Sequence, residues 1–176
     1  MKLQKKIKST AYASITAALV TVMLIAGGFF EMLDLTCASV ASLIIHISYT
    51  ESGGKRALMI YGVSAILANI FAPLMSCPIL FAAFFGYFPI VRAFLYKKIK
   101  IKELAYALLI VLYNAVMIAL YNIFKTVFGL ANEPMELYVA LLVSANIFYI
   151  CFELLMGRIM ILYNHYIKRN FKNRGI

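Results

Sequence analysis

Six long apolar stretches, separated by short polar or charged segments, dominate the sequence. Residues 104–123, for example, contain no charged side chain over about 20 positions, the length that an α-helix needs to cross the hydrocarbon core of a bilayer. Of the 176 residues, 64% are hydrophobic and only 14% are charged, whereas soluble domains are roughly half apolar and a quarter charged. The chain is therefore predicted to be an all-α membrane protein, a bundle of about six transmembrane helices in one membrane domain, residues 1–176.

Glycine, proline and charged residues bound the predicted spans. Gly27 and Gly28 close the first span, and Gly53 and Gly54 mark the turn between the second and third. The second and third spans are shorter than a typical bilayer crossing. Pro89 lies inside the fourth span and is expected to kink it. The six predicted spans are residues 11–30, 35–49, 57–72, 77–96, 104–128 and 135–163.

The basic residues predict that both ends of the chain are cytoplasmic. All of the 17 Lys and Arg residues except Lys125 lie at or near span ends that face one side of a six-span chain. Because basic segments beside membrane spans stay in the cytoplasm, the N-terminal segment, residues 1–10, and the tail, residues 164–176, are both placed inside. The opposite side carries acidic residues instead: Glu31, Asp34, Glu133 and Glu136.

No pattern of catalytic, metal-binding or nucleic-acid-binding residues is present. The net charge of +10 comes from short clusters between apolar runs, which indicates membrane topology rather than nucleic acid binding. Cys37, Cys77 and Cys151 have no paired spacing, and His46 has no second ligand nearby in the sequence, so no metal site is expected. The sequence predicts no enzyme activity and no cofactor.

Ala13 and Ala17 form a pair of small residues four apart, directly after the basic N-terminal segment. Helices in lipid associate by close packing, so such a pair marks a contact face, within the bundle or for a partner helix. With this pair, its length, its basic charge and six spans with both ends inside, the chain resembles the substrate-binding S components of energy-coupling factor transporters. In that family the alanine element contacts a transmembrane coupling subunit, which two cytoplasmic ATPases drive. The resemblance implies these partners, docking through Ala13 and Ala17, and a bacterial-type plasma membrane.

Polar side chains inside apolar spans are a second signal, because a polar group in hydrocarbon tends to face a cavity or a partner. In the resembled family the ligand binds in an outward-facing pocket built by the first outer loop and the last three helices. The resemblance implies a small, vitamin-like solute bound by Glu31, Asp34, Tyr87, Tyr113, Asn114, Tyr121, Asn122, Tyr138, Asn146 and Tyr149. In the other interpretation, the asparagines bridge helices and the tyrosines form interfacial belts. Since the chain has no Trp, ligand stacking would fall to Tyr and Phe.

Two functions from different classes remain open. The leading hypothesis is a subunit that captures a small solute and works with a separate ATPase module. The alternative is a non-transporting membrane scaffold, similar in size to the cell-shape protein that organises wall synthesis. A membrane-embedded enzyme is least favoured, because carboxylates and histidines do not cluster at matched depth.

Overall fold

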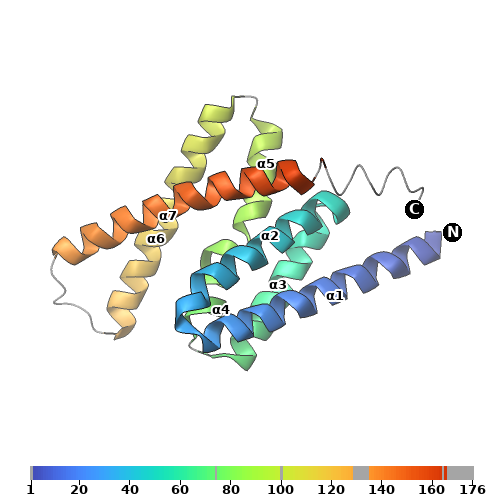
Figure 1. Cartoon of the computed structure of the whole chain (residues 1–176), viewed down its shortest axis with the longest axis horizontal. Helices are drawn as coiled ribbons and strands as arrows, with labels where there is room; N and C mark the ends of the chain where they lie inside the picture. The colour runs from blue at the N-terminus through green and yellow to red at the C-terminus, as the bar shows by residue number, and fades with distance from the viewer. Residues whose placement is uncertain (1, 74, 100, 129–134, 164, 166–176) are drawn as a thin grey trace. The chain divides into compact units, whose positions relative to one another are not determined.

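The chain is helical in the computed structural model (Figure 1). The structure describes residues 2–73, 75–99, 101–128, 135–163 and 165, and these contain no β-strand. The all-α prediction is therefore confirmed for the described residues. The chain divides into two compact units, unit 1 (Met1–Val116) and unit 2 (Met117–Ile176).

The order of the elements follows the predicted spans. Unit 1 contains, in its described part, α1 (Lys2–Phe29), a 3-10 turn η1 (Glu31–Leu33), α2 (Asp34–Ser52), α3 (Gly54–Phe71), α4 (Ser76–Leu80), a π-helical segment η2 (Phe81–Phe85), α5 (Phe88–Lys98) and the start of α6 (Lys102–Phe128). Unit 2 contains the rest of α6 and α7 (Met135–Leu162). The C-terminal tail lies outside the described residues, apart from His165.

Four helical stretches in the described residues are long and apolar enough to cross a membrane. They are Thr10–Phe29, Ser76–Lys98, Lys102–Ile123 and Leu142–Leu162, and they coincide with the first, fourth, fifth and sixth predicted spans. The second and third predicted spans are also helices, α2 and α3, but they are not among these four. Their polar ends explain this, since Asp34 begins α2 and Lys55 and Arg56 lie in the first turn of α3. The chain is a multi-pass membrane protein by length and composition; the count of six spans stays a prediction.

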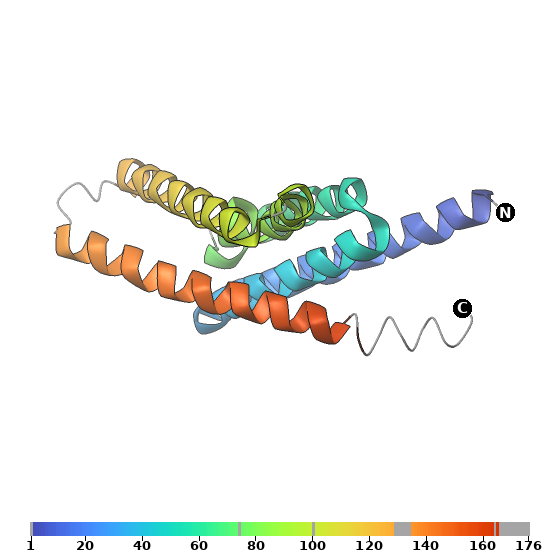
Figure 2. The ribbon, with the colours of Figure 1, turned by 90° about the horizontal axis from the view of Figure 1, so that it is seen from above.

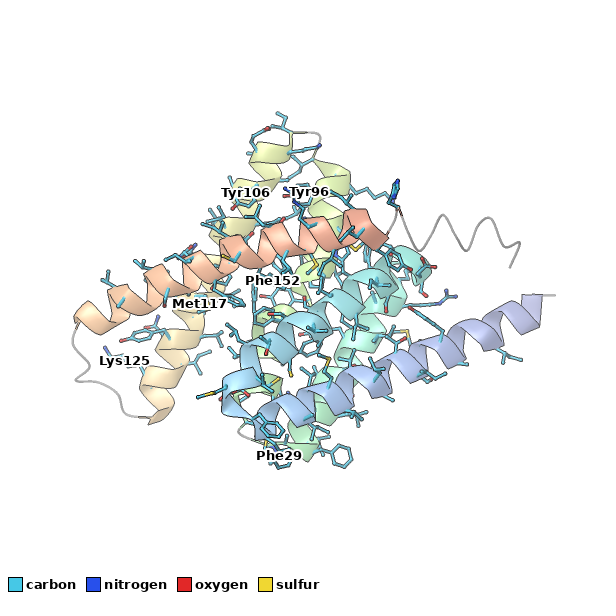
Figure 3. The ribbon with its side chains drawn as sticks, viewed as in Figure 1. Phe29, Tyr96, Tyr106, Met117, Lys125 and Phe152 are labelled. Atoms are coloured by element: carbon cyan, nitrogen blue, oxygen red, sulfur yellow. The ribbon has the colours of Figure 1, made fainter. Side chains whose placement is uncertain are left out.

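Both faces of α1 are apolar. Val20 and Leu24 are fully buried, whereas Ile15, Leu19 and Val22 are exposed. Phe29, at the C-terminal end of this helix, also projects outward and is 67% exposed (Figure 3). A helix on the surface of a soluble protein carries polar residues on its outer face. The large apolar residues on the exposed face of α1 are therefore suited to contact with lipid tails.

The predicted N-terminal segment, residues 1–10, is helical from Lys2 and continues into α1 without a break. The first turns of α1 extend past the connection between α2 and α3, as two views at right angles show (Figures 1 and 2). The basic N-terminal turns thus extend beyond the α2–α3 connection of unit 1.

Helix α2 lies at the centre of unit 1 and packs against α1, α3, α4, η2 and α5. Where α1, α2 and α4 meet, a Cβ atom on Gly27 would lie 2.6 Å from Cys37 Cβ and 2.9 Å from Cys77 Sγ. A Cβ on Gly28 would lie 2.7 Å from Met75 Sδ. The prediction that these glycines close the first span is confirmed, because α1 ends at Phe29, one residue after Gly28. Their small size is needed for close approach of neighbouring helices.

Gly53 forms the turn between α2 and α3, as predicted. Its φ of 84° lies in the left-handed region that glycine adopts without strain. Its N–H donates a hydrogen bond to the Tyr49 carbonyl at 2.9 Å, which closes the last turn of α2. A single glycine therefore reverses the chain, and α2 and α3 form a tight helical hairpin.

Candidate functional site

The fourth predicted span is interrupted in its middle. After α4 the chain widens into the π-helical segment η2, turns at Gly86 and Tyr87, and starts α5 with Pro89 in its first turn. Pro89 has no N–H and its ring crowds the carbonyl four residues earlier, so a regular helix cannot pass through this point. The prediction that Pro89 disturbs the fourth helix is confirmed, and the disturbance lies on the N-terminal side of the proline.

Neighbouring groups satisfy the backbone around this interruption. The Gly86 N–H donates to the Phe81 carbonyl at 2.8 Å, and the N–H groups of Ile90 and Val91 both donate to the Tyr87 carbonyl, at 3.0 and 3.1 Å. Irregular backbone at membrane depth persists only where the protein provides such partners. These hydrogen bonds therefore stabilise the interruption within the fold.

Helix α3 braces the interruption from the side. The Tyr61 hydroxyl donates a hydrogen bond to the Ala82 carbonyl at 2.8 Å. The Tyr61 ring lies against Gly86 so closely that a Cβ atom on this glycine would overlap it. Ala82 and Gly86, small residues four apart, therefore form the face on which α3 packs.

Helix α2 packs on the interruption as well. His46 is buried, with 5% of its surface exposed, and interacts with the backbone of Pro89 in α5. His46 therefore contributes to the packing of α2 against α5, which is the role expected of a single histidine inside a membrane helix. Among the described residues, no group of three or more His, Cys, Asp or Glu side chains could hold a metal ion.

An aromatic cluster surrounds the interruption and is formed by residues of α3, η2, α5, α6 and the turn before α5. Phe84 lies at its centre, with its ring centroid 4.7 Å from that of Phe88 and 4.8 Å from that of Tyr113. Phe84 also contacts Tyr87 edge-on at 6.4 Å, and Tyr87 in turn contacts Tyr61 at 6.3 Å. The cluster consists of Tyr61, Phe81, Phe84, Phe85, Tyr87, Phe88 and Tyr113. Its rings offer flat apolar faces and its tyrosines offer hydroxyl groups.

The structure brings two of the ten predicted substrate residues together in this cluster, Tyr87 and Tyr113, both in contact with Phe84. Asp34 begins α2, is 8% exposed and lies near the Cys77 thiol, at the junction where Gly27 packs. Glu31 lies in η1, and its side chain is outside the described part of the chain.

Each of the predicted asparagines donates a hydrogen bond to a carbonyl of its own helix. Asn114 donates to the Ile110 carbonyl at 3.0 Å, Asn122 to Ile118 at 2.8 Å and Asn146 to Leu142 at 2.8 Å. Such bonds to the carbonyl four residues earlier lower the cost of placing a polar side chain in an apolar helix. The remaining predicted residues, Tyr121, Tyr138 and Tyr149, lie in unit 2 on α6 and α7, and the side chain of Tyr138 is outside the description. A binding role for these residues stays a prediction.

Ala13 and Ala17 have different environments. Ala17 is buried, and its carbonyl accepts hydrogen bonds from the Thr21 hydroxyl at 2.8 Å and from the Ser64 hydroxyl of α3 at 3.3 Å. Ala13 is half-buried and lines a groove between α1 and α3. Ala17 therefore takes part in packing within the bundle, and Ala13 keeps an open face.

Sequence reasoning missed Tyr61. An aromatic residue inside an apolar run carries no local signal, and its role depends on α3 packing against the interrupted helix. By contrast, the aromatic run from Phe81 to Phe88 is visible in the sequence.

Comparison with known proteins identified no relative of this chain. A scan of protein-family models, a search of curated proteins and a search of solved structures each found no match to this chain.

Replacing Gly86 with alanine should lower the melting temperature of the detergent-purified protein, because the added methyl group would collide with the Tyr61 ring. Overpacking of this kind typically costs about 1–3 kcal/mol. Gly62→Ala is the matched control in α3, since a Cβ there would meet nothing within 4 Å; it should be neutral or gain about 0.5–1 kcal/mol. In the double variant Gly86→Ala with Tyr61→Ala, the loss should be smaller than the sum of the two single losses. Equal melting temperatures for Gly86→Ala and Gly62→Ala would refute the contact.

Proposed function

We propose that this chain is the substrate-capturing membrane subunit of a transporter that takes up a small, vitamin-like solute together with a separate coupling and ATPase module. The observation that carries the proposal is the interrupted fourth helix and the aromatic cluster around it. Discontinuous membrane helices are where transporters commonly bind their substrates. π-helical segments are also frequent at functional sites.

The chemistry of the cluster suits capture of a flat, partly apolar solute. Rings such as Phe84 and Phe88 can stack on or meet the edge of a planar ligand. Tyr87 and Tyr113 can add hydrogen bonds from their hydroxyl groups, so that a few polar contacts fix the orientation of a mostly apolar ligand. No covalent step is required, and binding followed by reorientation of the subunit is enough.

The proposal includes six membrane spans with both ends in the cytoplasm, with α2 and α3 as the two short crossings. Two features support it. The turn at Gly53 is too tight to leave room for a further element between these helices. In this arrangement Lys55 and Arg56 face the cytoplasm with the other basic segments, in agreement with the charge rule for membrane loops.

The proposed docking element for the coupling subunit is the cytoplasmic half of α1. Ala13 retains an open face there, whereas Ala17 is occupied by its contact with Ser64 of α3. Ala13 is therefore the member of the pair that a partner helix could reach, and Ala17 holds α1 in place beneath it.

Native mass spectrometry of the purified full chain, after exposure to a mixture of vitamins and metabolites, tests solute capture. We expect one small molecule bound per chain. Tyr87→Ala and Tyr113→Ala should each weaken its binding by about tenfold or more, equivalent to about 1.4 kcal/mol. Phe71→Ala is the matched control, because it removes an aromatic ring that is 69% exposed and belongs to another part of unit 1.

Absence of any retained solute, together with co-purification of wall-synthesis proteins and no ATPases, would refute the transporter proposal and favour the scaffold. Equal loss of binding in Phe71→Ala and the two tyrosine variants would show that the cluster does not form the site.

Paired substitutions separate docking from packing on α1. Ala13→Leu should leave the melting temperature and solute binding of the isolated subunit unchanged, but it should abolish uptake in cells that contain the coupling module. Ala17→Leu should lower the melting temperature, because its side chain would displace Ser64 and α3. If Ala13→Leu supports normal uptake, α1 does not dock through this residue.

A further inference from the structure

A groove with a cavity volume of about 220 Å³ lies between α1 and α3. Its lining combines Thr10, Ala13, Ser14 and Ala17 of α1 with Arg56, Met59, Ile60 and Val63 of α3. Ala17 and Ser64 mark its inner end, because the hydrogen bond between them brings the two helices together there. The groove therefore extends from this contact toward the N-terminal ends of both helices.

The polarity of the groove changes along its length. Thr10, Ser14 and Arg56 lie at the N-terminal end, and Ala17, Ile60 and Val63 lie deeper. The lining covers seven steps of each helix, a length of about 10 Å at 1.5 Å per residue. A cationic, hydroxyl-rich mouth thus leads into an apolar channel, which matches a molecule with an anionic head and an apolar tail.

Two of the polar side chains at the mouth, Arg56 and Ser14, are available to a ligand. Neither Arg56 nor Ser14 has a hydrogen-bond or ion-pair partner among the residues that the structure describes. Arginine offers five N–H donors in a planar fork that fits a phosphate group. Both side chains line the cavity and can serve the same ligand.

The basic residues near the mouth outnumber the acidic ones in sequence and favour an anion. Lys55 precedes Arg56, and the sequence before Thr10 contains four further lysines, Lys2, Lys5, Lys6 and Lys8. Neither α1 nor α3 contains an acidic residue, and Glu51, at the C-terminal end of α2, is the acidic residue nearest to Arg56 in sequence. Basic pockets between membrane helices near the cytoplasmic surface bind anionic lipid headgroups.

The apolar walls lie open to the lipid phase. Met59 is 68% exposed and Val63 is 47% exposed, so an acyl chain could enter the groove sideways from the bilayer. A soluble phosphate compound would gain nothing from these walls, whereas a lipid tail would bury its surface against them.

We infer that the groove between α1 and α3 is a binding site for one anionic phospholipid, with its phosphate at Arg56 and Ser14 and one acyl chain along Met59, Ile60 and Val63. The site does not depend on the proposed function, since it requires only that α1 and α3 lie in a membrane. Because Ala13 forms part of the groove wall, the lipid would lie beside the face proposed for the coupling subunit.

The test uses native mass spectrometry of the full chain extracted from vesicles that contain equal amounts of phosphatidylglycerol and phosphatidylcholine with matched acyl chains. The chain should retain phosphatidylglycerol in preference to phosphatidylcholine. Arg56→Gln should reduce this retention about tenfold, which corresponds to about 1.4 kcal/mol. Ser14→Leu, which fills the groove and keeps Arg56, should reduce it as well. Lys98→Gln is the control, because it removes an exposed cation of α5 that does not line the groove.

Unchanged phosphatidylglycerol retention in Arg56→Gln, or an equal loss in Lys98→Gln, would overturn the site, since binding would then follow overall charge. Circular dichroism checks that each variant keeps its helices. A photo-crosslinker at Met59 in native membranes provides a second readout. Crosslinks to lipid support the inference, whereas crosslinks to another protein would show that a partner helix occupies the groove.

Discussion

Close approach of helices at small residues holds unit 1 together. In lipid, an apolar side chain gains little by leaving the surface for the interior, because the surrounding tails are equally apolar. Stable contacts between helices must come instead from small residues, where two helix backbones can approach closely. Gly27 provides one at the junction of α1, α2 and α4, and Gly86 provides another beneath the Tyr61 ring. Ala17 supplies the third, with the Ser64 hydroxyl bonded to its carbonyl.

These contacts allow the fourth helix to break. An interrupted helix leaves backbone groups that hydrocarbon cannot satisfy. In this chain the Tyr61 hydroxyl reaches the Ala82 carbonyl only because Gly86 lets the ring lie against the segment. The packing of α3, the hydrogen bond to Ala82 and the position of the aromatic cluster therefore all depend on the contact between Tyr61 and Gly86. The proposed solute site rests on it, because the cluster collects around the same interruption.

The sequence predicted the elements better than their contacts. Apolar length alone predicted the four long helical stretches, since it reports directly on the solvent around a helix. Gly53 predicted the hairpin turn, because a local backbone conformation requires that residue. The packing role of Gly27 could not be predicted, since a glycine that ends a helix and a glycine that admits a neighbour look the same in sequence.

The candidate site was predicted in part for a similar reason. Aromatic residues near Pro89 could be seen in the sequence, but Tyr61 could not be assigned without knowing which helix faces them. Spacing grouped Ala13 with Ala17, yet only contact with α3 separates the buried member from the open one. Intramembrane asparagines suggested a pocket, whereas Asn114 and Asn146 can bond their own helices. The residue type predicts which interactions a side chain can form, but the neighbouring helix determines which of them it forms.

Topology mapping tests whether the interrupted helix can serve as a membrane-embedded site, because this requires that the chain cross the bilayer as proposed. Reporters that are active only in the cytoplasm or only outside the cell would be fused after Leu33, Gly53, Lys98 and Ile176. We expect a cytoplasmic signal for the last three positions and an external signal after Leu33. An external signal after Gly53 or Ile176 would contradict the proposed topology, because α2 and α3 would then not form two crossings between cytoplasmic ends.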